Sequence, residues 1–302
     1  MRAVFIGTGG SWPSPERNVS AFALSIGREV VLFDCGEGTQ RQLMRSSVSF
    51  MRISRIFITH FHGDHFLGLP GLIQSMALND RKDALEVYGP SGTERLVETL
   101  MRLGYFTPTY EVRVNDLKPG DVVRGTGYNV KCVEAAHNVP SLAYALEEAP
   151  RPGKFNLERA RGLGIPEGPL YARLQAGETI EYKGRSYSPE MVLGPPRRGR
   201  KVVCSGDTNP CSAIVELARG ADLLVHDATT ASELEEKANA YGHSSSRQAA
   251  EIAQEAGVGL LALVHLSPRY EDASQVLKDA REVFPNTILP SDLEELEIRL
   301  PD

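Results

Sequence analysis

The sequence predicts an α/β protein in which two β-sheets pack face to face and helices cover their outer faces. Short apolar runs, which are typical of buried strands, dominate the first half and the middle of the chain, with helical patterns between them. Several of these runs end at an acidic residue or a histidine, as at Asp34, His60 and His137. Because α/β sheets bind ligands at the carboxyl ends of their strands, the same pattern also predicts a functional site.

Apolar runs bounded by turn residues locate the strands. Their predicted ranges are 2–6, 19–26, 30–33, 55–58, 85–88, 111–114, 121–126, 128–135, 143–147, 201–204, 222–225 and 260–264. Amphipathic spacing and capping residues predict helices over 39–45, 69–78, 92–103, 212–218, 233–239, 244–256 and 274–284. Thr39 is expected at the N-cap of its helix, and residues 244–246 supply candidate caps for the helix that they begin.

Length and composition are those of one large or two ordinary globular domains. The 302 residues are 41% hydrophobic, which allows a sizeable core. No apolar run approaches the roughly 20 residues of a membrane span, and the first residues do not have the pattern of a signal peptide. The cysteines Cys35, Cys132, Cys204 and Cys211 have no metal-finger or CxxC spacing. We therefore expect reduced thiols and a cytoplasmic protein.

Charge is distributed unevenly along the chain. The whole chain carries −6, but residues 151–201 hold eleven Lys/Arg and five Asp/Glu, which gives this segment +6 and leaves −12 for the rest. The overall charge argues against broad, non-specific nucleic-acid binding. A basic segment on an acidic body indicates instead a specific anionic partner.

Residues 148–196 form an insert with its own composition. Eight Gly and six Pro fall within 151–201, so the segment is rich in turns. It is too long for an ordinary connection, and is either a disordered loop or a small excursion with its own structure. We expect residues 1–302 to form a single domain that carries this insert. Apolar side chains that can form a satellite core favour the structured alternative: Phe155, Leu157, Leu163, Ile165, Leu170, Tyr171, Leu174, Tyr182 and Tyr187.

The strongest local signal is the stretch His-Phe-His-Gly-Asp-His from His60 to His65. Three imidazoles and a carboxylate suit a borderline cation such as zinc. Because crowding makes it hard for four such closely spaced residues to serve one ion, the spacing suggests two ions, with His60 and His62 on one and Asp64 and His65 on the other. Gly63 is expected to let this crowded loop turn at a place where a Cβ would clash. The alternative, a set of solvated loop histidines, is disfavoured by the alternating pattern.

Three further candidate ligands follow predicted strands: His137, Asp207 and His265. Taken singly, a histidine at a strand end is usually just hydrogen-bonded, but together with the first cluster these residues complete a set for two zinc ions with a shared water. The expected assignment is His60, His62 and His137 on one ion, Asp64, His65 and His265 on the other, and Asp207 as the bridge.

Further motifs extend this cluster along the whole chain. They are Gly7-Thr8, Arg17-Asn18-Val19-Ser20, Phe33-Asp34-Cys35-Gly36-Glu37-Gly38-Thr39-Gln40, Leu69-Pro70-Gly71-Leu72, Ser205-Gly206-Asp207-Thr208, His226-Asp227-Ala228-Thr229, Gly242-His243-Ser244-Ser245 and Val264-His265. With the histidine stretch they resemble the metallo-β-lactamase superfamily and, within it, the ribonuclease Z family. Two departures are a first turn, residues 9–12, that is more polar than expected and Asp227 where Glu is common. Neither is a candidate metal ligand.

The resemblance implies the metallo-β-lactamase fold, an αβ/βα four-layer sandwich, with an inserted arm. It implies two Zn²⁺ per chain on the seven residues above, a homodimer and a precursor tRNA as substrate. Cleavage would leave a 3′-hydroxyl on the tRNA and a 5′-phosphate on the trailer. The insert resembles the arm with which the family grips tRNA, and its candidate contacts are Arg151, Lys154, Arg159, Arg161, Gly168 and Pro169.

Catalytic roles are expected for two residues. Asp64 is a candidate metal ligand and, by the resemblance, the proton acceptor. His243 is the candidate general acid for the leaving ribose 3′-oxygen, because an imidazole titrates near neutral pH. Asp227 would orient His243 or keep it protonated, and His226 would orient a ligand from the second layer. The alternative for His243 is helix capping near Ser244.

Two other functions stay open at this point. Another hydrolase of the superfamily, such as a cyclic phosphodiesterase, arylsulfatase or lactonase, would not need the basic insert. A non-catalytic RNA-binding module on a degenerate scaffold would be expected to have lost some of the seven ligands, and no RNA-recognition motif with stacking aromatics is apparent. A zinc-dependent tRNA 3′-endonuclease is therefore the favoured prediction.

Overall fold

Two β-sheets form the frame of residues 1–301, which are the residues that the structure, a computed structural model, describes. The first sheet contains, in spatial order, β16 (Glu295–Glu297), β1 (Arg2–Gly7), β2 (Ala21–Ile26), β3 (Glu29–Phe33), β4 (Ile53–Phe57), β5 (Leu85–Pro90) and β6 (Val112–Leu117). The second contains β15 (Thr287–Ile288), β14 (Leu261–Val264), β13 (Leu223–Asp227), β12 (Lys201–Cys204), β9 (Leu142–Glu148), β8 (Tyr128–Glu134) and β7 (Val122–Gly125).

Each sheet has a parallel part, formed by β3 to β6 in the first and by β12 to β15 in the second. Within each part the carboxyl ends of the strands therefore meet at one edge of the sheet, where α/β proteins bind ligands.

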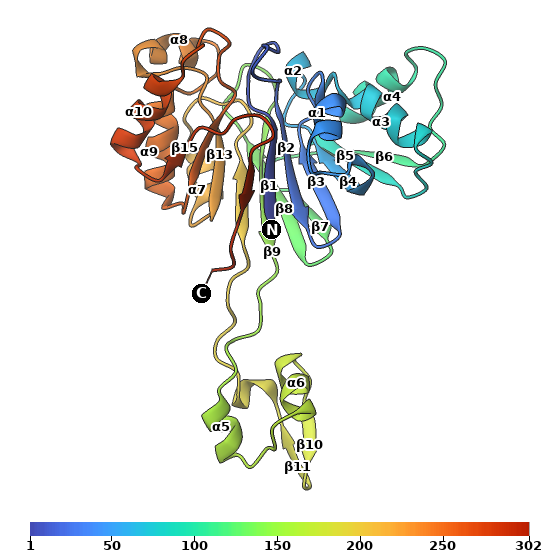
Figure 1. The fold of residues 1–302 in the computed structure, drawn as a ribbon, viewed down its shortest axis with the longest axis vertical. Coiled ribbons are helices and arrows are strands. Elements are labelled where there is room, and N and C mark those ends of the chain that lie inside the picture. The colour runs from blue at the N-terminus through green and yellow to red at the C-terminus, as the bar shows by residue number, and fades with distance from the viewer. Residues whose placement is uncertain (302) are drawn as a thin grey trace. The chain divides into compact units, whose positions relative to one another are not determined.

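Helices cover the outer face of each sheet, as Figure 1 shows. Those on the first sheet are α1 (Thr39–Arg45), α3 (Leu69–Leu78) and α4 (Thr93–Met101), and those on the second are α7 (Ser212–Ala218), α9 (Ser246–Ala256) and α10 (Ser274–Val283). Shorter elements are α2 (Gly63–Phe66), α8 (Glu235–Ala240) and the 3₁₀ turns Phe50–Arg52 and Ser232–Leu234. The layers run helix, sheet, sheet, helix, so the predicted four-layer sandwich is confirmed.

Aromatic side chains fill the space between the two sheets. Phe57 on β4 stacks on Tyr88 on β5 with ring centroids 4.9 Å apart, and Tyr144 from β9 in the other sheet lies 5.2 Å from Phe57. Tyr144 is fully buried, and its hydroxyl donates a hydrogen bond of 2.7 Å to the Ile58 carbonyl, so its polar end is satisfied. These contacts fix the end of β4 directly before His60.

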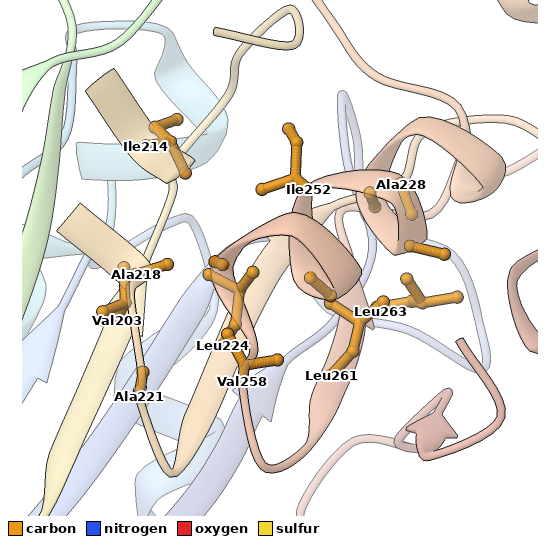
Figure 2. Close-up of a cluster of buried hydrophobic side chains, with 14 of the residues drawn as sticks. Val203, Ile214, Ala218, Ala221, Leu224, Ala228, Ile252, Val258, Leu261 and Leu263 are labelled. Carbon is orange, nitrogen blue, oxygen red and sulfur yellow. The ribbon is translucent and has the colours of Figure 1, made fainter. Parts of the chain in front are cut away.

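A separate core lies between the second sheet and its helices. Figure 2 shows Val203, Leu224 and Leu263 of this sheet in one buried cluster with Ile214 of α7 and Ile252 of α9. The first sheet has the equivalent core against its own helices, to which these residues contribute: Leu43, Leu72, Met76 and Val97. Burial on both faces explains why the parallel strands β12, β13 and β14 are largely apolar runs.

Local sequence signals located most elements of the body well. The helices 39–45, 69–78 and 212–218 have the predicted bounds. At α9 the expected serine cap is Ser245, which forms a capping box with Gln248. The prediction missed the edge strands β15 and β16 and the helix α2.

The predicted cap at Thr39 was wrong, and of the two expectations for Gly63 the clash of a Cβ is confirmed but the loop turn is not. Gly38, in the left-handed conformation at φ 79°, is the N-cap of α1, and Thr39 is the first residue of the helix. Gly63 does not have a positive φ; it begins α2, so that the histidine stretch is half loop and half helix. Its hydrogen still matters, because a Cβ there would lie 2.8 Å from Cδ1 of Leu67.

Residues Glu148–Arg200 form a second compact unit, here called the arm, to which Leu300 and Pro301 also belong; the body comprises Met1–Glu147 and Lys201–Arg299. The arm contains α5 (Leu157–Gly162), α6 (Pro169–Gln175), the antiparallel pair β10 (Ile180–Tyr182) and β11 (Arg185–Tyr187), and the 3₁₀ turn Pro189–Met191. Its own small core consists of Ala160, Ile165, Tyr171, Leu174, Ile180, Tyr187 and Val192. Of the apolar residues expected in that core, Leu157 is instead 50% exposed.

Two further observations concern the whole chain. Within residues 1–301 no helix is both long enough and apolar enough to span a lipid bilayer. The four cysteines are free thiols, three of them buried.

Candidate metal centre and active site

The structure brings all seven predicted ligands together. They come from the loop after β4, the helix α2 and the segments that follow β8, β12 and β14. Their side chains fall into overlapping groups, and within each group the candidate ligand atoms lie within 4.8 Å of one another. Polar residues that follow predicted strands had indicated such a cluster, with members far apart in the sequence.

The first group contains His60, His62, His137 and Asp207. Nδ1 of His62 lies 3.3 Å from Nε2 of His137, and Nε2 of His60 lies 3.6 Å from Oδ2 of Asp207. His60 and Asp207 are buried, whereas His62 and His137 are partly accessible. Three imidazoles and a carboxylate with one open side can hold a zinc ion and leave room for a substrate.

The second group contains Asp64, His65 and His265. Nε2 of His265 lies 3.3 Å from Oδ2 of Asp64, and Nε2 of His65 lies 3.7 Å from the same oxygen. Oδ2 of Asp207 lies 3.3 Å from Nε2 of both His65 and His265. A single carboxylate oxygen of Asp207 therefore faces the ligands of both groups.

Four histidines of the cluster are oriented in the same way. Nδ1 of His60 lies 3.0 Å from Oγ1 of Thr59, and Nδ1 of His137 lies 2.7 Å from the Gly242 carbonyl oxygen. The other two have equivalent partners, since Nδ1 of His65 lies 2.8 Å from Asp34 and Nδ1 of His265 lies 3.0 Å from Thr229. A partner at Nδ1 fixes the tautomer and leaves the Nε2 lone pair for a cation.

The partners of these Nδ1 atoms were not assigned a role from the sequence. Asp34 was noted as a polar residue at the end of a strand, but nothing local connected it with His65, which lies 31 positions away. Asp34 also accepts hydrogen bonds from the backbone N–H and the hydroxyl of Thr59, at 2.7 Å and 3.0 Å. The motif at residues 33–40 could have indicated this contact, because an acidic residue at a strand end can orient a histidine of a neighbouring metal site.

The backbone of the site is strained at functional positions. Asp34 has φ 58° and His265 has φ 61°, in the left-handed region that non-glycine residues rarely adopt. Gly10 packs against His265 so closely that a Cβ would lie 2.5 Å from the ring. Such conformations persist only where the surrounding structure fixes them, and they are typical of active sites.

The buried charges of the cluster favour a cation. Burial alone would raise the pKa of Asp207, but His265 and His65 hold it well below its usual range, so this carboxylate stays charged. Burial lowers the pKa of His65, yet Asp207 and Asp34 outweigh burial and raise it well above its usual value. For Asp64, the hydrogen bond to His265 and the charge of His65 outweigh burial and lower the pKa.

Two buried nitrogen atoms of the cluster have no hydrogen-bond partner in the described residues. Nε2 of His60 and Nε2 of His65 make no hydrogen bond to any residue within 1–301, although both side chains are almost completely buried. Unpartnered buried polar atoms are costly. Both atoms lie within 3.6 Å of Oδ2 of Asp207, so a metal ion at this place would satisfy them. The residues present thus fit a metal centre.

His243 lies at the edge of this cluster, beside Asp227. Its Nδ1 lies 3.0 Å from Oδ2 of Asp227 and 3.8 Å from Oδ2 of Asp207. Burial lowers the pKa of His243, but the charges of Asp227 and Asp207 outweigh burial and raise it to about 9. Asp207, Asp227, His243 and His265 also form a group of candidate ligands. His243 is not a helix cap, because Ser245 caps α9.

Comparisons with known proteins agree with this arrangement. A family model described as "Beta-lactamase superfamily domain" matches residues 182–266, and one described as "Anti-Pycsar protein Apyc1" matches residues 1–146. The chain is similar to ribonuclease Z of Methanosarcina acetivorans, with 52% identity over 299 residues, 99% of this chain and 98% of the relative. Ribonuclease Z of Methanosarcina mazei is 49% identical with the same coverage. The chain belongs to the ribonuclease Z family.

A solved structure extends this comparison. The crystal structure of human tRNase Z, short form, matches with a TM-score of 0.74 at 28% identity and covers 99% of this chain and 100% of that chain. Both the fold and the family expected from the sequence are therefore confirmed. As a member of the ribonuclease Z family the chain is an enzyme, which excludes the non-catalytic binding module.

His226 does not face the candidate ligands, although it belongs to a motif of the ribonuclease Z family. Its Nδ1 lies 2.8 Å from the carbonyl oxygen of Asp227, and its Nε2 is buried without a hydrogen-bond partner in the described chain. Burial lowers the pKa of His226, so it is a neutral side chain. His226 belongs to none of the groups of candidate ligands in the described residues.

The arm residues predicted to bind substrate differ in their availability. Arg161 forms an ion pair with Glu167 at 2.7 Å, and the guanidinium of Arg151 donates to the Pro301 carbonyl. Lys154 and Arg159 are exposed, and within residues 1–301 neither has a carboxylate at ion-pair distance. Gly168, at φ 123°, is the N-cap of α6, and Pro169 is its first residue.

Proposed function

We propose that the chain is a zinc-dependent endoribonuclease that removes the 3′ trailer from precursor tRNA. Hydrolysis would leave a 3′-hydroxyl on the tRNA and a 5′-phosphate on the trailer. The observation that carries the proposal is the position of Asp207, one oxygen of which lies 3.3 Å from His65 and His265 and 3.6 Å from His60. The names of the relatives, ribonuclease Z and tRNase Z, support RNA and tRNA as the substrate.

The donor set supports zinc and two ions. Imidazole nitrogen and carboxylate oxygen are the ligands of catalytic zinc sites, and His62 and His137 of the first group are partly accessible. We assign one ion to His60, His62 and His137, the other to Asp64, His65 and His265, and both to Asp207. Zinc ions held there would supply hydroxide near neutral pH and neutralise phosphate charge.

The residues around the ions have separate tasks. Asp64 accepts a 2.6 Å hydrogen bond from the Ser11 backbone N–H, which orients its carboxylate, and we assign Asp64 the role of proton acceptor. Breakage of the phosphorus–oxygen bond leaves a negative charge on the ribose 3′-oxygen, and His243 donates a proton to it. Asp227 orients His243 and keeps it protonated.

The arm supplies cations for the RNA backbone. Lys154 and Arg159 are the strongest candidates, because both are exposed and lack an ion-pair partner in the described residues. Phosphate contacts are indifferent to sequence, which suits an enzyme that must accept many tRNAs. Arg161 is already paired with Glu167 and would contribute less.

The homodimer and the cytoplasmic location stay predictions. Met44, Leu67 and Leu78, which belong to the segment from α1 to α3, are 58%, 49% and 82% exposed, and they are candidates for a contact between subunits. Replacing Leu78 by Glu should shift a dimer towards monomer in analytical ultracentrifugation, whereas a monomeric wild type would refute the expectation.

The experiment that tests the function is incubation of the purified, zinc-loaded protein with a 3′-extended precursor tRNA and mapping of both product ends. We expect one cut at the 3′ end of the tRNA part, with the end groups named above. The Asp207→Ala variant is the control and should give no product. Hydrolysis of small phosphodiesters or esters without any cut in precursor tRNA would favour the alternative, another hydrolase of the superfamily.

A further inference from the structure

A hollow beside His243 has none of the seven candidate ligands in its walls, although Ser11 and Thr229 in those walls contact Asp64 and His265. Its volume is about 330 Å³, and its walls include Trp12, Lys237, Tyr241 and Arg269. These residues come from three separate parts of the body: the loop after β1, the helix α8 with its carboxyl end, and the segment after β14. The hollow has no role in the proposal above.

Two of these side chains are exposed aromatic rings. Trp12 is 63% exposed and Tyr241 is 61% exposed. Trp12 is the single tryptophan of the chain and lies in the turn where this sequence departs from the expected pattern. Exposed rings that line a cavity next to an RNA-cutting site offer flat apolar faces, and nucleobases stack on such faces regardless of their identity.

The other two are cations without an acidic partner. Lys237 and Arg269 are exposed, and no carboxylate within residues 1–301 lies at ion-pair distance from either. Nε of Arg269 donates to Oγ of Ser267 at 3.1 Å, which orients the guanidinium. No Asp or Glu of the described chain lines the hollow, although the sequence outside 151–201 carries −12. The hollow should therefore attract an anion, although the body as a whole is negatively charged.

The loop that carries Trp12 is tied to the active site. The N–H of Ser11 donates to Asp64, and Ser11 itself has φ 68°, in the left-handed region. The N–H of Gly10 donates to the Leu266 carbonyl at 3.0 Å, and the N–H of Trp12 to the Gly10 carbonyl at 2.9 Å. The backbone under Trp12 is thus fixed before substrate arrives, which reduces the entropic cost of binding.

We infer that this hollow binds the last nucleotide of the tRNA part, on the 5′ side of the bond that is cut. Its base would stack on Trp12 and Tyr241, and its 5′ phosphate would lie near Lys237 and Arg269. The side of the bond follows from His243, which lines the hollow and gives its proton to the 3′-oxygen of that nucleotide. The inference rests on the proposed function, because it assumes that the reacting phosphodiester is in RNA.

The single tryptophan allows a direct binding test with the zinc-loaded protein. The probe is an RNA hairpin with one unpaired 3′ nucleotide and a free 3′-hydroxyl, which mimics the tRNA product and offers no bond to cut. Saturating hairpin should quench the emission of Trp12, because a base stacked on indole alters its fluorescence. The same hairpin without the overhang, and a 5′-phosphorylated trinucleotide that mimics the trailer, should leave the emission nearly unchanged. Quenching by the trinucleotide alone would overturn the assignment to the 5′ side.

Variants separate stacking from charge. Loss of a stacking ring should weaken binding of the overhang hairpin roughly 5- to 100-fold, so we expect this range for Tyr241→Leu and Trp12→Leu. Trp12→Phe keeps an aromatic face and should recover most of the affinity. Lys237→Ala and Arg269→Ala should weaken binding less at high salt than at low salt. Lys278→Ala, an exposed lysine on α10, is the matched control and should bind like wild type.

The outcomes distinguish this inference from the proposed function. If precursor tRNA is cut at the expected bond but the overhang hairpin neither quenches Trp12 nor discriminates Tyr241→Leu from wild type, the nucleotide site is wrong and the function stands. If the overhang hairpin quenches Trp12 while precursor tRNA is not cut, nucleotide binding is supported and the proposed function fails.

Discussion

Asp34 and His65 are joined by a hydrogen bond of 2.8 Å between Oδ2 and Nδ1. The bond turns Nε2 of His65 towards Asp207, 3.3 Å away. Asp34 is 6% exposed and adopts a left-handed backbone, so the fold positions this carboxylate at some energetic cost. A residue that contacts no candidate metal position thus orients a ligand.

Replacing Asp34 by Ala should therefore weaken zinc binding by about 10- to 100-fold, as is usual when the partner of a metal-bound histidine is removed. The measurement is a competition titration with a chelator. Asp34→Asn keeps an acceptor oxygen for Nδ1 and should lose less. An unchanged zinc affinity in Asp34→Ala, with the fold intact by circular dichroism, would show that His65 needs no partner.

Metal content tests the role of Asp207. The wild-type protein should carry about two zinc ions per chain, by the number of ligands available. Asp207→Ala should lose zinc and activity together, because its carboxylate faces both groups of histidines. Elemental analysis is the measurement, and a variant that retains two ions and full activity would contradict the bridging role.

His243 should be needed for turnover but not for zinc. His243→Ala is expected to lower kcat on precursor tRNA by roughly 10²- to 10⁴-fold, the usual contribution of a general acid. Zinc content should stay near that of the wild type, because the Nδ1 of His243 is bonded to Asp227. A parallel loss of zinc would mean that His243 is a ligand, as the group that it forms with Asp207, Asp227 and His265 also permits.

The pH profile should depend on Asp227. Its charge, with that of Asp207, overcomes burial and raises the pKa of His243 to about 9. A raised pKa means that the acid is protonated below this value and is lost as the pH rises through it, so kcat should fall on the alkaline side. Asp227→Asn removes one charge and should move this fall to lower pH. An alkaline limb at the same pH in both proteins would exclude His243 as the group that titrates there.

The arm can be removed at a defined place. The backbones of Arg151 and Arg197 exchange hydrogen bonds of 2.7 Å and 2.9 Å, so a two-residue Asn-Gly hairpin turn can join them after deletion of residues 152–196. The deletion should raise KM for precursor tRNA strongly and flatten its salt dependence, because phosphate contacts are lost. Hydrolysis of bis(p-nitrophenyl) phosphate and zinc content should be retained.

A finer version of the arm experiment uses charge alone. The double variant Lys154→Ala/Arg159→Ala should raise KM for precursor tRNA more than Arg161→Ala, since Arg161 is paired with Glu167. An equal effect of the two would remove the distinction between free and paired cations, and an unchanged KM after the deletion would remove the proposed role of the arm.

The sequence by itself determined the features that depend on neighbouring residues. Apolar runs and caps located helices such as 69–78 and 212–218, because periodicity and capping are encoded within a few positions. The histidine stretch from His60 to His65 predicted a metal centre, because its alternating pattern is rare in solvated loops. This stretch supplied four of the seven candidate ligands, and polar residues after predicted strands supplied the other three; the structure brings the same seven together.

Only the tertiary structure decided which distant residues support that cluster. The two-residue strand β15 and the three-residue strand β16 carry too little sequence for a periodic signal, and β16 is defined by its pairing with β1 at the other end of the chain. Three other features arise in the same way. They are the hydrogen bond between Asp34 and His65, the burial of His226, which lowers its pKa, and the hollow that Trp12 and Tyr241 both line. Each depends on how strands far apart in sequence are registered and packed, and local patterns do not encode such long-range contacts.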